Sequence, residues 1–146
     1  MAIDSTREVR RAILTLLKND AGLLAIVPKA RMFPQTAPAT PSWPFLKMGS
    51  PSIVPVRASC MDGGELIVAV HGFANQRVAA GKVVETAEDH ASRLGFAISK
   101  ALDRKAPTIT GGVAKIQWTG SQLLIDGGEA DAFHTVQNFR IRCVTA

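Results

Sequence analysis

The stretch from Val83 to Lys105 carries the most consistent periodic signal in the sequence, and it constrains the fold most. Its apolar residues recur at the spacing of one helix face: Ala87, Ala91, Leu94, Ile98, Ala101 and Leu102. Thr86 can cap the start, and Pro107 is expected to stop the helix. A helix over residues 86–104 would extend about 28 Å. That length suits a helix that covers one face of a sheet.

The N-terminal segment predicts a further helix. Ser5 and Glu8 have the spacing of a capping box, and an apolar stripe follows them, so residues 5–18 are expected to form a surface-packed helix. Residues 20–27 can form a short second helical turn, which Pro28 ends.

The remaining apolar segments predict strands. Residues 65–73 (ELIVAVHGF) form the strongest candidate, and both of its faces are largely apolar, which favours a central strand. Pro55 lacks a backbone donor, so segment 52–59 is expected at a sheet edge or a bulge. Gly120 indicates that segment 113–125 forms either two strands or one bulged strand. The other candidate strands are 31–33, 45–48, 52–59, 113–125 and 134–144.

Proline and glycine predict the connections. Four prolines between Pro34 and Pro44 indicate an extended loop within one fold, because too few residues precede it for an independent domain. Asp62-Gly63-Gly64 predicts a tight turn, as do the glycines at 111–112 and 127–128. The expected fold is α+β: one domain over residues 1–146, with a mixed, mostly antiparallel sheet, the long helix on one face and the N-terminal helix.

Composition narrows the function classes. The 146 residues include 47% hydrophobic and 20% charged residues, and no apolar run is long enough for a membrane helix. No secretion signal is recognisable, and two cysteines, Cys60 and Cys143, are too few for a disulfide scaffold. The net charge of +5 raises nucleic acid as a partner, but the basic residues form no run and lack interleaved aromatic residues.

The sequence contains residue types that are found in catalytic and metal sites, but each set has a simpler structural explanation. Cys60, His71 and Asp62 could supply a thiol nucleophile with its base and orienting acid, but no activating helix start is near. His71, His90 and His134 could meet at a metal, although their spacing matches no zinc motif. We therefore expect no catalytic, metal or cofactor site.

Two further patterns are also better explained without a binding or catalytic role. The glycine pairs lack the spacing of a phosphate-binding loop and are expected to be turns. Glu88 and Asp89 are adjacent on the long helix and point in different directions, which favours solvated helix-start charges over a general acid-base pair. Edge strands and a long loop instead suit a subunit that assembles with others, although monomeric binding modules share these features.

The order of these landmarks resembles the tail terminator, or tail-completion, proteins of long-tailed phages and gene transfer agent particles. The resemblance rests on an N-terminal helix with an apolar run (AILTLLKNDAGLLAIV), a short strand (ARMF), and a Pro-rich loop that leads to Trp43-Pro44-Phe45-Leu46-Lys47-Met48-Gly49. A polar hairpin, the strand and helix ELIVAVHGFAN…VVETAEDHASRLGFAISKAL and the closing strand VQNFRIRCV follow. The resemblance covers nearly the whole chain and includes no catalytic motif.

The resemblance implies a non-enzymatic subunit of a homo-hexameric ring at the head-proximal end of the tail tube. Such a ring stops tube polymerisation, contacts the tail tube protein and the head-tail connector or stopper, and lets DNA pass through its lumen without sequence readout. It would be a virion or particle tail component, assembled in the host cytoplasm. The alternative is a small non-enzymatic module that binds nucleic acid or another ligand.

No individual functional residue follows from the resemblance. By charge alone, five basic residues are interface or lumen candidates: Arg57, Arg77, Lys82, Arg140 and Arg142.

Overall fold

The computed structural model describes residues 4–59, 61–126 and 132–145. The helices are α1 (Thr6–Lys18), α2 (Ala21–Leu24), α3 (Ala87–Leu102) and the 3-10 turn η1 (Lys29–Arg31). The strands are β1 (Met32–Phe33), β2 (Phe45–Met48), β3 (Ser52–Ala58), β4 (Met61–Asn75), β5 (Arg77–Ala79), β6 (Lys82–Glu85), β7 (Thr108–Ile109), β8 (Gly112–Ile125) and β9 (Ala132–Thr145). The fold is α+β, as predicted.

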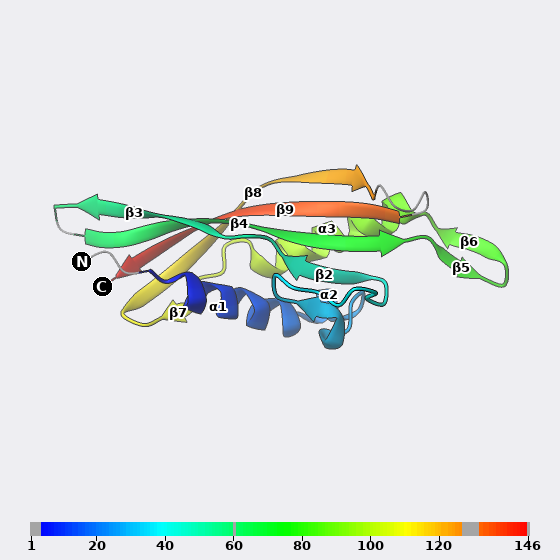
Figure 1. The fold of residues 1–146 in the computed structure, drawn as a ribbon, viewed down its shortest axis with the longest axis horizontal. Coiled ribbons are helices and arrows are strands. Elements are labelled where there is room, and N and C mark those ends of the chain that lie inside the picture. Colours follow the sequence, from blue (N-terminus) through cyan, green and yellow to red (C-terminus); the bar gives the residue numbers. More distant parts are fainter. Residues whose placement is uncertain (1–3, 60, 127–131, 146) are drawn as a thin grey trace.

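Seven strands form one sheet in the order β1-β2-β4-β9-β8-β7, and β3 also pairs with β4. The β1–β2 pair is parallel and the others are antiparallel, which confirms a mixed, mostly antiparallel sheet. Strands β5 and β6 form a separate hairpin. The β3–β4 and β5–β6 hairpins project from opposite ends of an elongated molecule (Figure 1).

Helix α3 packs on β4, β9 and β8, as its apolar stripe predicted. Leu94 and Ile98 are fully buried in the seam, and the Thr86 side chain accepts a hydrogen bond from the Asp89 amide at 3.2 Å. The helix ends earlier than Pro107 suggested. Asp103 is already extended and Arg104 has a φ of +62°, so the chain turns away before the proline.

Helix α1 contacts α3, β1 and α2, and it buries Val9, Ile13 and Leu17. The expected capping box at its start is wrong. The Ser5 side chain makes no capping hydrogen bond, and the Glu8 carboxylate instead accepts from the Thr110 amide at 2.6 Å. A tertiary contact with the β7–β8 turn has replaced the local one.

Strand β4 is central, between β2 and β3 on one side and β9 on the other. Only one of its faces is buried: Leu66, Val68 and Val70 are at most 1% exposed, whereas Ile67 is 57% exposed. Leu66, Val68 and Val70 belong to the core cluster that also contains the buried residues of α1 and α3. The opposite face of the sheet is therefore much more open than its apolar sequence indicated.

The predicted turn at Asp62-Gly63-Gly64 is wrong, because these residues lie inside β4. Gly63 pairs with Val56 on β3 and with Val144 on β9. A Cβ atom at Gly63 would overlap the carbonyl oxygen of Cys143, so glycine is required there by close backbone approach instead of turn geometry.

Strands β3 and β8 and the proline-rich loop agree with the sequence-based predictions. Pro55 lies on β3, which pairs only with β4 and is an edge strand, and β8 is one strand with an irregularity between Trp118 and Gly120. Residues 34–44 contain neither helix nor strand, and Gly111, with a φ of +78°, lies in the β7–β8 turn. The glycines at 127–128, like Cys60, lie outside the described residues.

Candidate assembly surfaces

The outward side of the sheet carries a group of basic side chains, here called the basic sheet face and formed by Lys47, Lys115, Arg140 and Arg142. The register places these residues on one side, because Lys115 pairs with Arg142 and Lys47 pairs with His71. The Arg142 Nε donates to the Glu65 carboxylate at 3.2 Å and the Arg140 Nη2 donates to the Gln117 carbonyl oxygen at 2.9 Å. Arg142 is thus neutralised by a carboxylate, whereas Arg140 meets a neutral amide.

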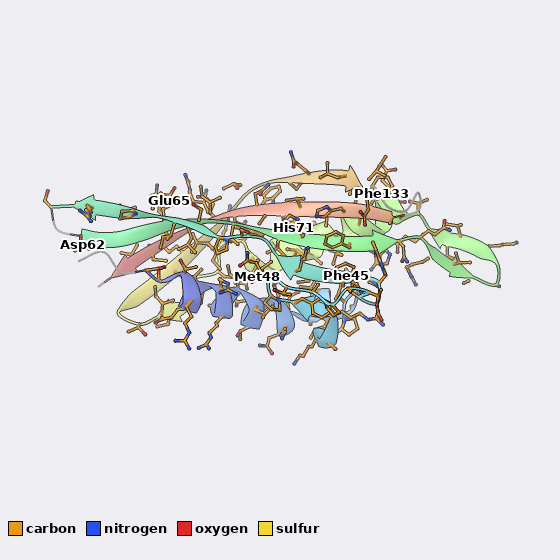
Figure 2. The ribbon with its side chains drawn as sticks, in the orientation of Figure 1. Phe45, Met48, Asp62, Glu65, His71 and Phe133 are labelled. Carbon is orange, nitrogen blue, oxygen red and sulfur yellow. The ribbon has the colours of Figure 1, made fainter. Side chains whose placement is uncertain are left out.

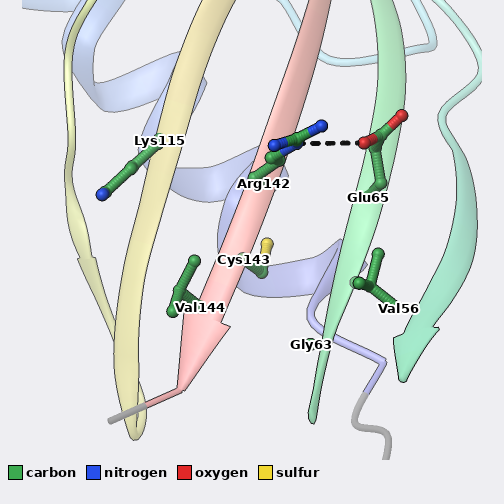
Figure 3. Close-up of a pocket in the computed structure, with 8 residues that line it drawn as sticks. Val56, Gly63, Glu65, Lys115, Arg142, Cys143 and Val144 are labelled. Atoms are coloured by element: carbon green, nitrogen blue, oxygen red, sulfur yellow. Dashed lines mark hydrogen bonds and ion pairs between the residues drawn. The ribbon is translucent and has the colours of Figure 1, made fainter. Parts of the chain in front are cut away.

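A shallow depression of about 310 Å³ opens at one end of this face (Figure 3). Glycine makes it possible, because Gly63 and Gly64 leave space between Val56 and Val144. The Glu65–Arg142 ion pair and Lys115 also line it. Burial raises the pKa of the Cys143 thiol, so this cysteine is held in its protonated, unreactive form. The lining suits contact with apolar side chains.

Two of the three histidines meet across β4 and β9. The His71 Nδ1 and His134 Nε2 atoms are 2.7 Å apart, so one ring donates to the other, and Phe73 stacks on His134 at 4.2 Å between centroids. Burial lowers the pKa of both rings, that of His134 to about 4. His90 is elsewhere, bonded to the Asn75 carbonyl at 2.8 Å.

The arrangement of these groups does not assemble the catalytic triad considered from the sequence. Asp62 lies near the end of the β3–β4 hairpin and His71 lies in the body of the sheet (Figure 2). At about 3.3 Å per residue, roughly 30 Å of strand separates their Cα atoms. Among the described residues, no group of three possible ligands could hold a metal ion.

A groove lined by both apolar and neutral polar side chains lies between α3 and β8, here called the α3–β8 groove. It is lined by Phe96, Trp118 and Leu123, which are 68%, 43% and 38% exposed, and its volume is about 280 Å³. The Trp118 Nε1 donates to the Gln137 side chain, which fixes the indole at one wall. Sequence reasoning missed the groove, although a phenylalanine off the apolar stripe of α3 was a usable signal.

The β5–β6 hairpin, here called the arm, is exposed along its length. Val78, Val83 and Val84 are 53–56% exposed, and no strand was predicted here from the sequence. The Glu85 carboxylate accepts from both Arg77 and Arg93, the latter on α3, and hydrogen bonds from Arg93 hold the pKa of Glu85 down to about 2.

The five basic candidates fall on three separate surfaces. Arg140 and Arg142 lie on the basic sheet face, Arg77 and Lys82 lie on the arm, and Arg57 lies on β3, paired in register with Asp62. The structure therefore brings two pairs of candidates together but does not unite all five. Lys47 and Lys115 were not singled out from the sequence and join the basic face through strand pairing.

Comparisons with known proteins fit an assembling subunit. One chain in the solved structure "Virion of native gene transfer agent (GTA) particle" has the same fold, with a TM-score of 0.77 at 17% identity over 98% of this chain and 99% of that chain. No curated protein sequence matches. In the part of the chain that the structure describes, no helix is long and apolar enough to cross a membrane. The family model described as "Tail completion protein gp17" matches residues 11–143, and the chain therefore belongs to this family of tail completion proteins.

Proposed function

We propose that this tail protein is a non-enzymatic, single-domain subunit of a homo-hexameric ring that ends the tail tube and joins it to the head. The family match over residues 11–143 carries the proposal, since it covers nearly the whole chain. The fold shared with a chain of a gene transfer agent virion extends it to such particles as well as to phages. The ring would meet the tail tube protein on one side and the connector or stopper on the other, and it would assemble in the host cytoplasm.

The shape of the molecule supports a ring-forming role. Hairpins project from both ends (Figure 1), so each copy offers two different surfaces to its neighbours. Contacts between different surfaces repeat around a closed ring when the rotation between copies is suitable. The exposed valines of the arm and the exposed aromatic residues of the α3–β8 groove supply apolar area for such contacts.

The basic sheet face supports a lumen that tolerates DNA without reading its sequence. Arg140 is the strongest candidate there, because its guanidinium meets a neutral amide. Cations that neutralise phosphates act on any sequence. We assign Arg140 and Arg142 to the lumen, and Arg57, Arg77 and Lys82 to contacts between subunits.

The test is the native mass of the purified protein, measured by light scattering behind a sizing column over a range of protein and salt concentrations. A sixfold mass, with a ring in negative-stain electron micrographs, is expected. A monomer at every concentration would contradict ring formation by this chain.

The basic sheet face also favours one alternative, a small module that binds nucleic acid. That function predicts that the free monomer binds DNA with an affinity that falls steeply as salt rises. Replacing Arg140 and Arg142 with glutamine would then abolish binding by the monomer. In the ring proposal, the same double variant still forms the ring and changes only DNA passage.

A further inference from the structure

The arm has the properties of a segment that is completed by a partner. It is a two-stranded hairpin, and such hairpins are at best marginally stable in water on their own. Val78 pairs with Val83 across the two strands, and both side chains are more than half exposed. The arm therefore presents apolar side chains away from the body of its own chain.

The α3–β8 groove has the size of a site for side chains. Its volume of about 280 Å³ leaves room for a few side chains. Phe96 and Leu123 supply apolar walls, and Ser92 and Gln122 supply neutral polar groups. Nothing in this lining would select a charged small ligand.

The strand beside the groove has an open edge. The first half of β8 is covered on its free side, because Ile116 exchanges backbone hydrogen bonds with Arg104 and Lys105 at 3.0 and 2.9 Å. Beyond Gly120, β8 pairs with β9 alone among the described strands. An open strand edge can accept a further strand through main-chain hydrogen bonds.

We propose that the arm of one copy binds in the α3–β8 groove of a second copy and adds a strand to the open edge of β8. This inference rests on the proposed function, because it specifies the contact between neighbours in the ring. The arm and the groove are different surfaces, so their contact is head-to-tail, as a ring requires.

Charge complementarity supports a second copy as the occupant. Glu88 lies four residues before Ser92 and eight before Phe96, so it continues the same exposed stripe of α3. Among the described residues, neither Glu88 nor Asp89 belongs to an ion pair. Lys82 at the arm supplies a cation that these carboxylates can meet.

The test places a charge in each surface. Val83→Lys alters the arm and Phe96→Lys alters the groove, and both sites are exposed, so each variant is expected to fold. Ile67→Lys is the matched control, because Ile67 is a β-branched strand residue that is 57% exposed on β4, outside the arm and the groove. Far-UV circular dichroism and thermal unfolding of all three establish that the fold is retained.

Light scattering then gives the protein concentration at which half of the chains are assembled. Val83→Lys and Phe96→Lys are each expected to raise this concentration at least about tenfold, since a buried unpaired charge opposes the contact, and Ile67→Lys leaves it unchanged. Lys82→Glu is expected to weaken assembly, and adding Glu88→Lys is expected to restore it.

The outcomes separate the two proposals. A wild-type ring that Val83→Lys and Phe96→Lys leave intact would overturn the arm–groove contact and keep the ring. A wild-type chain that is monomeric at every concentration would overturn both. Disruption by Ile67→Lys alone would overturn the arm–groove contact and place the interface on the basic sheet face.

Discussion

Gly95 lies in the middle of α3, where the effect of a single methyl group can be worked out. A helix interior normally favours alanine over glycine by about 1 kcal/mol. Here the added Cβ atom would lie 2.5 Å from the Thr135 hydroxyl oxygen and 2.6 Å from the Gln137 side-chain nitrogen. These two groups are buried and bonded to each other at 2.9 Å.

The two effects of Gly95→Ala therefore oppose each other. Overpacking costs about 1–3 kcal/mol, and displacing a buried hydrogen-bonded group costs about 1–3 kcal/mol more. Against a propensity gain of about 1 kcal/mol, we expect the free energy of unfolding to fall by about 1–5 kcal/mol. In a chain of this length, at about 3 °C per kcal/mol, the melting temperature would drop by about 3–15 °C.

The assay is urea unfolding at one fixed protein concentration, because assembly contributes to apparent stability. Lys100→Ala is the control on the exposed side of the same helix and outside the groove, and it is expected to change stability by no more than about 0.5 kcal/mol. In a Thr135→Ala background, which removes the hydroxyl, Gly95→Ala should cost less. Equal or greater stability of Gly95→Ala in the native background would refute this account of the α3–β9 seam.

Three further predictions concern the core and the sheet. Leu94→Asp buries an unpaired charge at a fully buried site and should cost several kcal/mol in chemical unfolding, whereas melting with the wild type would mean that the helix face is misassigned. Gly63→Ala should push β4 away from β9 and lower the denaturant concentration at the unfolding midpoint. An unchanged midpoint would show that the Cys143 carbonyl can move to make room for the methyl group. The pKa of His134 falls from 6.5 to about 4 on folding, so the unfolded chain binds more protons below pH 6.5 and stability falls as the pH drops from 6.5 toward 4. His134→Gln should flatten stability between pH 6.5 and 5, and an unchanged slope would assign that loss to other groups.

The parts of the fold that the sequence predicted are those with a one-sided burial pattern. Leu94 and Ile98 recur at helical spacing because that face meets the sheet, and Leu66, Val68 and Val70 alternate because the core lies on one side. Close approach between strands leaves no such pattern. Gly63 of β4 is explained only once the β9 backbone is known to pass beside it.

The assembly surfaces were harder to predict because they depend on pairing between distant segments. The His71–His134 contact and the joining of Lys115 to Arg142 follow from strand register, which a single sequence does not specify. The arm was missed because both of its faces are exposed, so neither helical nor strand periodicity marks it. Arg140 and Arg142 were singled out as candidates because charge was judged residue by residue.

The attachment of the arm to α3 affects how tightly the arm can bind a partner. Glu85 holds Arg77 in the arm and Arg93 in the helix at once, with contacts of 3.3 and 2.9 Å. A protruding segment that pivoted freely would lose orientational entropy on docking, and that loss would weaken the complex. The contact between Glu85 and Arg93 ties the base of the arm to α3 and restricts the pivot beforehand, so binding begins from a preorganised geometry. Because the pKa of Glu85 is about 2, this preorganisation survives mild acid.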